Sequence, residues 1–157
     1  MNDSHLRQLT DESNIIKLIN HFYFSVDMRD YATMRNCLTD KIEFDYTALF
    51  DTQMPPTADE LVENVRLNHR GLKGIQHITT NHLVTLKENT AECRVNFQAQ
   101  HFLPNDRGSS LWTLGGRYLY SLVRIKEEWK IKGCIVHVSW TDGNLQIFEL
   151  AHKQTNQ

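Results

Sequence analysis

The chain has 157 residues, 40% of them hydrophobic and 23% charged, which is typical of one compact globular domain with a core large enough to enclose a ligand cavity. The 17 Lys and Arg residues nearly balance the 19 Asp and Glu residues, and no basic stripe is present, so we expect no nucleic-acid partner. The longest apolar runs are far shorter than a membrane span, so no membrane association is expected.

The first part of the chain is expected to be helical. Apolar residues recur at three- and four-residue steps, which predicts an amphipathic helix over about residues 11–27. The residues of this apolar stripe are Ile15, Ile19, Phe22 and Val26. Asp30 can cap a second, short helix that ends near residue 38.

A strand, a break and a third helix are predicted next. Residues 41–49 have the pattern of a strand, and Pro55-Pro56 interrupts the chain after it. Thr57-Ala-Asp-Glu60 is a capping box, in which the Thr and Glu side chains bind each other's backbone N–H groups. It predicts a helix that begins here and that Gly71 can close.

The second half of the chain is expected to be rich in strands. The predicted strands are residues 75–86, 91–103, 111–126 and 129–140. Helices followed by a long antiparallel meander predict an α+β fold, with the N-terminal helices packed on one face of a curved, mostly antiparallel sheet. We expect a single domain over residues 1–157, with its core at about 10–143 and a polar C-terminal tail at 144–157 that carries one apolar cluster.

The cysteines and the N-terminus bear on the compartment. Cys37, Cys93 and Cys134 are an odd number and lie far apart, with no Cys-x-x-Cys pair. The first residues lack the basic region and apolar run of a secretion signal. We therefore expect reduced, mostly buried thiols and a cytoplasmic protein.

The stretch from Cys93 to His101 is the most informative part of the sequence. Its residues alternate between apolar or small and polar, so one face of this strand points inward, and His101 ends that face. An imidazole there is either a hydrogen-bonded core histidine or a titratable group that faces a cavity. The pattern alone leaves both interpretations open.

Two candidates for chemistry lie in the first half of the chain. Asp27 ends the first predicted helix and shares a face with Tyr23, four residues earlier. The alternative for Asp27 is a solvated aspartate at a helix end. Tyr46, in the first strand, could polarise a carbonyl through its hydroxyl or be a core tyrosine.

Two histidines lie in one predicted strand. His77 and His82 are five residues apart, which places them on opposite faces of a regular strand, so we expect only one of them to face inward. The periodicity does not say which one, because both faces carry apolar residues.

Several side chains are candidates for contact with a substrate. The aromatic ones could line an apolar pocket or simply fill the core, and the arginine could bind an anionic group or form a surface salt bridge. These candidates are Tyr23, Phe97, Trp112, Arg117 and Tyr120.

The order of these residues resembles that of a known group. From about residue 12 to 143, the chain is similar to scytalone dehydratase and the wider SnoaL-like, nuclear-transport-factor-2-like superfamily with a cystatin-like fold. Val26-Asp-Met-Arg-Asp-Tyr31 resembles the family's Tyr-Asp-x-x-Asp-Trp helix end. Phe44-Asp-Tyr46 and Ile75-Gln-His77 resemble its Asp-Tyr and Gln-His motifs, and His101 ends a strand where the dehydratases have their second histidine.

The resemblance implies a cone-shaped α+β barrel with an internal apolar pocket that needs no metal and no cofactor. It implies that Tyr46 polarises a substrate carbonyl and that His77 acts as acid and base. It also implies that Asp27 orients His101. The family forms dimers and trimers, so a homo-oligomer is expected.

Two departures from the family pattern bear on the substrate. Val26 stands where the dehydratases have another tyrosine, and Tyr23, one turn earlier, is the candidate to replace it. The family's later Ser and Asn have no clear counterpart between Arg117 and Ser121, so scytalone itself is not the expected substrate. A different hydroxylated carbonyl compound, polycyclic or steroid-like, fits better.

Three hypotheses follow. The first is a cofactor-independent dehydratase, isomerase or cyclase that acts next to a carbonyl of a small, apolar, hydroxylated substrate. The second is a non-catalytic ligand-binding or dimerisation module, because this fold is reused without chemistry. The third, a two-histidine, one-carboxylate metal site of Asp27, His77 and His101, is disfavoured by the resemblance.

Overall fold

The computed structural model describes residues 3–49 and 54–155, which form four helices and five strands in these ranges. The helices are α1 (Asp3–Asp27), α2 (Tyr31–Asn36), α3 (Ala58–Asn68) and α4 (Ile147–Thr155). The strands are β1 (Leu38–Asp45), β2 (Gly74–Lys87), β3 (Thr90–Phe102), β4 (Leu111–Ile125) and β5 (Glu128–Gly143).

The predicted helix starts are confirmed at two caps. The Asp30 carboxylate accepts a hydrogen bond from the Thr33 backbone N–H at 3.0 Å and begins α2. The Thr57 hydroxyl accepts one from the Glu60 backbone N–H at 3.3 Å and begins α3. Helix α1 starts at Asp3, whereas the apolar stripe predicts a start near residue 11. Residues 3–10 are exposed, so no buried apolar stripe marks this part of the helix in the sequence.

Strand β1 begins at Leu38, three residues before the predicted start at residue 41, and it ends at Asp45 rather than at residue 49. The Asp45 carboxylate accepts a hydrogen bond from the Thr47 backbone N–H at 3.0 Å, and the Leu49 N–H binds the Tyr46 carbonyl. This side-chain-stabilised turn removes residues 46–49 from the strand.

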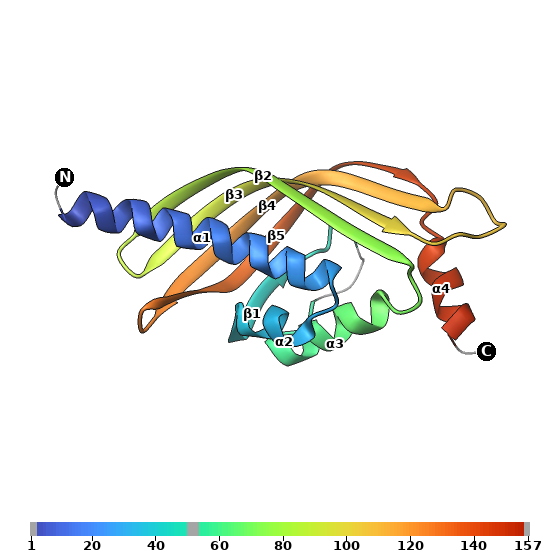
Figure 1. Cartoon of the computed structure of the whole chain (residues 1–157), viewed down its shortest axis with the longest axis horizontal. Coiled ribbons are helices and arrows are strands. Elements are labelled where there is room, and N and C mark those ends of the chain that lie inside the picture. Colours follow the sequence, from blue (N-terminus) through green and yellow to red (C-terminus); the bar gives the residue numbers. More distant parts are fainter. Residues whose placement is uncertain (1–2, 50–53, 156–157) are drawn as a thin grey trace.

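The five strands form one curved, open sheet in the order β1-β5-β4-β3-β2. Strand β1 pairs with β5 in parallel, and every other neighbouring pair is antiparallel. The predicted α+β class is therefore confirmed. The cone is a curved sheet whose edge strands β1 and β2 stay apart, rather than a closed barrel (Figure 1).

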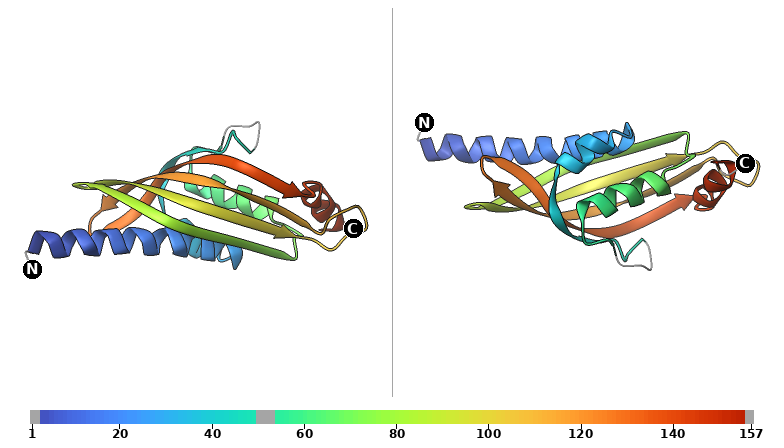
Figure 2. Two further views of the ribbon diagram at one scale, coloured as in Figure 1. Left: turned by 90° about the horizontal axis from the view of Figure 1, so that it is seen from above. Right: turned by 90° about the horizontal axis from the view of Figure 1, so that it is seen from below.

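The three N-terminal helices cover the concave side of the sheet and leave its other side bare (Figures 1 and 2). The core lies between these layers and includes Ile15 and Ile19 of α1, Leu61 of α3 and Tyr120 of β4, all nearly inaccessible. The segment expected to be a polar tail contains helix α4, which packs at the end of the sheet where β3 ends and β4 begins.

A buried ion pair ties α1 to the sheet. Both carboxylate oxygens of Asp11 accept hydrogen bonds from the Arg124 guanidinium, at 2.9 and 2.5 Å, and the Trp129 indole N–H donates to the same carboxylate at 3.1 Å. The Arg124 guanidinium also lies 4.4 Å from the centre of the Trp129 ring. This cluster holds the helix across β4 and β5.

Candidate active site

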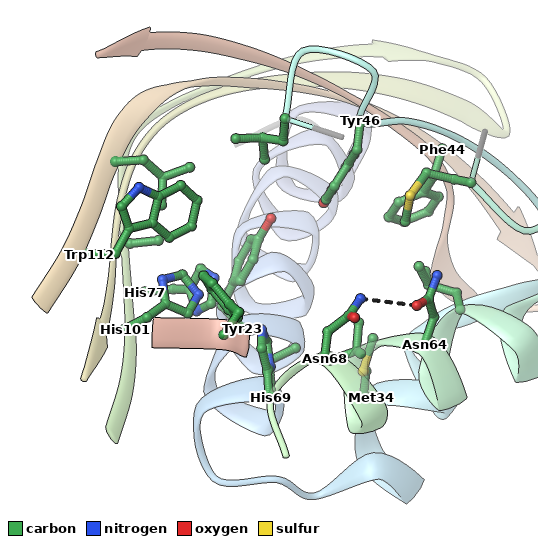
Figure 3. Close-up of a pocket in the computed structure, with 18 of the residues that line it drawn as sticks. Tyr23, Met34, Phe44, Tyr46, Asn64, Asn68, His69, His77, His101 and Trp112 are labelled. Carbon is green, nitrogen blue, oxygen red and sulfur yellow. Dashed lines mark hydrogen bonds between the residues drawn. The ribbon is translucent and has the colours of Figure 1, made fainter. Parts of the chain in front are cut away.

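A pocket of about 470 Å³ lies between the concave sheet and helices α1, α3 and α4. Most of its wall is apolar or aromatic, with contributions from Phe22, Phe44, Trp112 and Phe148. The few polar groups that reach it are therefore in a position to orient a small molecule. Figure 3 shows how the labelled side chains converge on this space.

Asp27 and His77 form a hydrogen-bonded pair at the pocket wall. Asp27 is the last residue of α1, and β2 passes beside this helix end. The Asp27 carboxylate binds His77 twice, through the imidazole Nδ1 at 2.6 Å and through the backbone N–H at 2.8 Å. The Tyr23 ring stacks on the imidazole with ring centres 4.7 Å apart. These contacts fix the position of His77 from three sides.

The pairing determines which nitrogen of His77 can act as a base. A carboxylate only accepts hydrogen bonds, so Nδ1 of the neutral imidazole carries the proton and Nε2 carries a free electron pair. The His77 side chain is 9% exposed and lines the pocket. The pair therefore presents a proton acceptor to a bound molecule.

Two more histidines lie at the α4 end of the pocket. His101 ends the inward face of β3, and His69 follows the last residue of α3. The two ring centres are 5.5 Å apart, and the ring centres of His101 and His77 are 6.0 Å apart. Burial is the main cause that lowers the pKa of both His69 and His101 to about 3. His77 lowers both values further, and so do Arg29 for His69 and His69 for His101. Both imidazoles are therefore neutral at physiological pH.

Tyrosine hydroxyls form the opposite side of the site. The Tyr120 hydroxyl donates a 2.6 Å hydrogen bond to the Tyr23 hydroxyl. The hydroxyl ends of Tyr23 and Tyr46 point toward one another (Figure 3). The Tyr46 hydroxyl oxygen also lies 3.9 Å from the Cys134 sulfur. Burial raises the pKa of Tyr23, Tyr46 and Tyr120 well above the usual range. These hydroxyls therefore keep their protons and can donate them in hydrogen bonds.

The family model described as SnoaL-like domain matches residues 7–135, which is most of the chain. The chain belongs to the SnoaL-like family. No curated protein sequence matches it.

Solved structures share the fold of this SnoaL-like protein. Kfla4162 from Kribbella flavida superposes with a TM-score of 0.83 at 21% identity, over 92% of this chain and 98% of that one. A provisionally assigned scytalone dehydratase of Novosphingobium aromaticivorans gives 0.76 at 18% identity, over 86% and 88%. Hexachlorocyclohexane dehydrochlorinase LinA-type3 of Novosphingobium barchaimii LL02 gives 0.73 at 17% identity, over 90% and 94%. At these identities the likeness shows the fold alone.

Three of the four predicted catalytic residues of the SnoaL-like protein line one pocket, namely Tyr46, His77 and His101, and the fourth, Asp27, lies behind His77 and binds it. The predicted pairing of Asp27 with His101 is wrong, because both carboxylate oxygens of Asp27 bind His77. His101 instead packs among aromatic rings. The helix end and β2 are adjacent in space, whereas β3 is one strand further away.

The predicted substrate contacts divide into three groups. Tyr23 and Trp112 line the pocket. Phe97 and Tyr120 lie behind its wall, where Phe97 stacks on Tyr118 at 3.9 Å and Tyr120 supports Tyr23. Arg117 is exposed, and it pairs in register with Asn96 and His137 across the sheet. The prediction that Arg117 contacts the substrate is wrong, because side chains alternate along β4 and its neighbour Tyr118 faces inward.

The predicted opposition of His77 and His82 is also wrong. Strand β2 has a register shift between Thr80 and Leu83, and Asn81 adopts a φ of +56°. This bulge adds a residue and restarts the alternation, so both histidines have the partly buried pattern of the inward face. His82 lies further along the strand and does not line the pocket.

Several pocket residues come from α3 and α4, where no site residue was predicted. Asn68 donates a 3.0 Å hydrogen bond to the Asn64 side chain, and both line the pocket together with His69. Phe148 of α4 packs against His101 and Trp112, with ring centres 5.0 and 5.3 Å apart. The available signal was the four-residue spacing of Asn64 and Asn68, which places both amides on one face of the third predicted helix, with His69 directly after them.

Two findings bear on other classes of function. Within residues 3–49 and 54–155, no group of three or more His, Cys, Asp or Glu side chains has the arrangement to hold a metal ion. No helix in these ranges combines the length and the apolar character that crossing a membrane requires.

Proposed function

We propose that this protein is a cofactor-independent lyase or isomerase that moves a proton next to a carbonyl of a small, apolar, hydroxylated substrate. The observation that carries this proposal is the hydrogen bond between Asp27 and His77 Nδ1 at the wall of an apolar pocket that tyrosine side chains also line, because a proton on Nδ1 leaves Nε2 of the neutral imidazole as the acceptor. Two structural neighbours are named as a dehydratase and a dehydrochlorinase, and both names describe eliminations.

The base in this proposal is His77. Its Nε2 takes a proton from the carbon next to the substrate carbonyl, and the electron pair of that C–H bond forms an enolate. The Asp27 carboxylate stabilises the imidazolium and holds its orientation. The apolar wall excludes water, which strengthens these electrostatic contacts.

The tyrosines stabilise the charge that develops on oxygen. The Tyr46 hydroxyl donates a hydrogen bond to the enolate oxygen, and Tyr23 is the second donor because Tyr120 already donates to it. In an elimination, the Nε2 proton of His77 then passes to the leaving hydroxyl, a double bond forms and water departs. In an isomerisation, the same proton returns to another carbon.

The test uses a β-hydroxy ketone and its parent ketone. We expect wild-type protein to convert 3-hydroxy-1-tetralone into 1-naphthol and water, and to speed the exchange of the C2 protons of 1-tetralone with D₂O. Asp27→Asn and His77→Gln should each slow both reactions by about 10²-fold or more, because the base loses its orientation or is absent. Absorbance follows the naphthol, and proton NMR follows the exchange.

His82→Gln is the matched control, since His82 lies on the inward face of the same strand but outside the pocket. It should react at the wild-type rate. Equal rates for wild type and His77→Gln in both assays would contradict the proposal, provided that circular dichroism shows both proteins folded. Tyr46→Phe should slow exchange with a smaller effect, since one of two donors remains.

A further inference from the structure

We propose that Arg29 is a positioning residue for the Asp27–His77 pair, because its side chain holds the start of β2 against the end of α1. Arg29 does not line the pocket, so it acts on the reaction only through the position of His77. The inference rests on the proposed function for the role of His77 as a base. The position of the imidazole can nevertheless be measured without any reaction.

Strand β2 depends on side chains for its position relative to α1. It lies at an edge of the sheet and pairs with β3 on one side only, while its other edge runs beside α1 (Figures 1 and 2). The backbone groups of a helix bind one another, so α1 cannot extend the strand ladder. Near His77, the Asn20 amide oxygen accepts a hydrogen bond from the Thr79 hydroxyl at 3.1 Å, and the Asp27 carboxylate accepts one from the His77 backbone N–H. With so few links, the loss of one can shift the strand.

The guanidinium of Arg29 supplies a further link between these elements. Its Nη2 donates a 2.6 Å hydrogen bond to the carbonyl oxygen of Leu72, a buried residue in the turn between α3 and β2. The next residue, Lys73, donates its backbone N–H to the Phe102 carbonyl at 2.8 Å as the chain joins the sheet. The bond from Arg29 therefore fixes the point at which the chain enters β2, a few residues before His77.

The backbone at Arg29 has a conformation that glycine adopts more readily. Its φ is +57°, in a turn where the Arg29 N–H binds the Val26 carbonyl at 3.1 Å and the Asp30 N–H binds the Ser25 carbonyl at 2.8 Å. Helices often end in this turn, and its left-handed residue is usually glycine, because any other side chain costs stability there. An arginine is expected where its side chain makes a contact that glycine cannot make. The bond to Leu72 is that contact.

The links of Asp27 and Arg29 complement each other because both residues belong to the end of α1. Asp27 accepts hydrogen bonds from the His77 backbone N–H at 2.8 Å and from Nδ1 at 2.6 Å, whereas Arg29 donates to Leu72. Two links to one short segment fix its direction as well as its distance from the helix. Without Arg29, the segment can pivot about the Asp27–His77 contact, so the base loses its orientation and the reaction slows.

The test replaces Arg29 by glycine, which removes the link and relieves the backbone. We expect Arg29→Gly to unfold at about the wild-type temperature, because the relief offsets the lost hydrogen bond. The exchange of the C2 protons of 1-tetralone should slow about tenfold. In NMR spectra, the backbone amide of His77 should exchange with D₂O about tenfold faster than in wild type, and its Nδ1 proton signal should broaden. Arg29→Asn, which tolerates the left-handed backbone but is too short to reach Leu72, should behave in the same way.

Two variants serve as controls. Lys126→Gly is the matched one, because Lys126 is also a cationic residue with a φ of +58°, and it lies in the turn between β4 and β5, outside the pocket. It should leave the tetralone exchange and the His77 signals unchanged. Arg29→Lys keeps a charged donor on a long side chain and should restore most of the rate and of the His77 protection.

Two results would overturn the positioning role. The first is wild-type protection of the His77 amide together with an unchanged Nδ1 proton signal in folded Arg29→Gly or Arg29→Asn, which would assign Arg29 to stability alone. The second is an equal change of these signals in Lys126→Gly. The NMR comparison does not depend on turnover. If wild-type protein fails to exchange 1-tetralone, the proposed function fails, and the His77 signals still decide the role of Arg29.

Discussion

Gly71→Ala should detach helix α4 from the pocket. Gly71 lies in the turn after α3 with a φ of +84°, and α4 passes directly over it. A Cβ at this position would lie 2.4 Å from the Ala151 carbonyl oxygen and 2.9 Å from its carbonyl carbon. These are backbone atoms, so no side-chain rotation can relieve the overlap. Either the turn or the helix must move.

The expected cost has two parts. An alanine in the left-handed backbone region costs roughly 1–2 kcal/mol relative to glycine. Overpacking against a fixed backbone typically adds about 1–3 kcal/mol, unless α4 moves away and gives up the burial of Ile147 and Ala151. We therefore expect a loss of about 2–5 kcal/mol in the stability of the docked α4, part of which will appear as local opening rather than global unfolding.

Hydrogen exchange followed by mass spectrometry measures this directly. Peptides that cover residues 147–155 should exchange faster in Gly71→Ala than in wild type, while peptides from β3 and β4 should change little. Gly74→Ala is the matched control, because a Cβ there meets only the Phe102 side chain at 3.4 Å, which is an ordinary contact. Unchanged exchange in α4 for Gly71→Ala, or an equal change for Gly74→Ala, would refute the reasoning.

Two further changes test the packing behind the pocket. In Asp11→Asn the buried Arg124 guanidinium loses its counter-charge. We therefore expect urea denaturation at pH 7 to show a free energy of unfolding about 3 kcal/mol lower than that of wild type. A decrease smaller than about 0.5 kcal/mol would contradict this expectation. The Arg124 hydrogen bonds hold the pKa of Asp11 below its usual 3.8, so the difference from wild type should be complete above about pH 4 and shrink as the pH falls through the lower folded-state pKa. In Tyr120→Phe the Tyr23 hydroxyl loses its donor, and thermal unfolding should show a loss of about 1 kcal/mol. An unchanged melting temperature would mean that Tyr23 finds another donor.

The features predictable from the sequence are those set by local chemistry. The Thr57 capping box begins α3, the alternation before His101 places it on the inward face, and the Asp30 side chain caps α2. Each depends on residues a few positions apart, whose preferences do not change with the rest of the fold.

The features that could not be predicted depend on tertiary contacts. The partner of Asp27 is decided by which strand passes the end of α1, and the sequence does not contain that distance. The bulge at Asn81 interrupts a pattern that otherwise predicts a regular strand, so His77 and His82 lie on the same face although their spacing predicts opposite faces. His69 becomes a pocket residue only because α3 ends opposite β3.

The parallel pairing of β1 with β5 has a kinetic consequence for the site. Leu38 of β1 pairs with Ile131 of β5, so these two strands are separated by most of the chain. Strands β2 to β5 instead pair with strands that are next to them in the sequence, joined by hairpins or one short loop. Pairings across long sequence separations form slowly, because the intervening chain must first be ordered. We therefore expect the meander that carries His77 and His101 to form first during folding. The segment that carries Tyr46 then docks last, and the pocket gains its tyrosine side only at the end of the process.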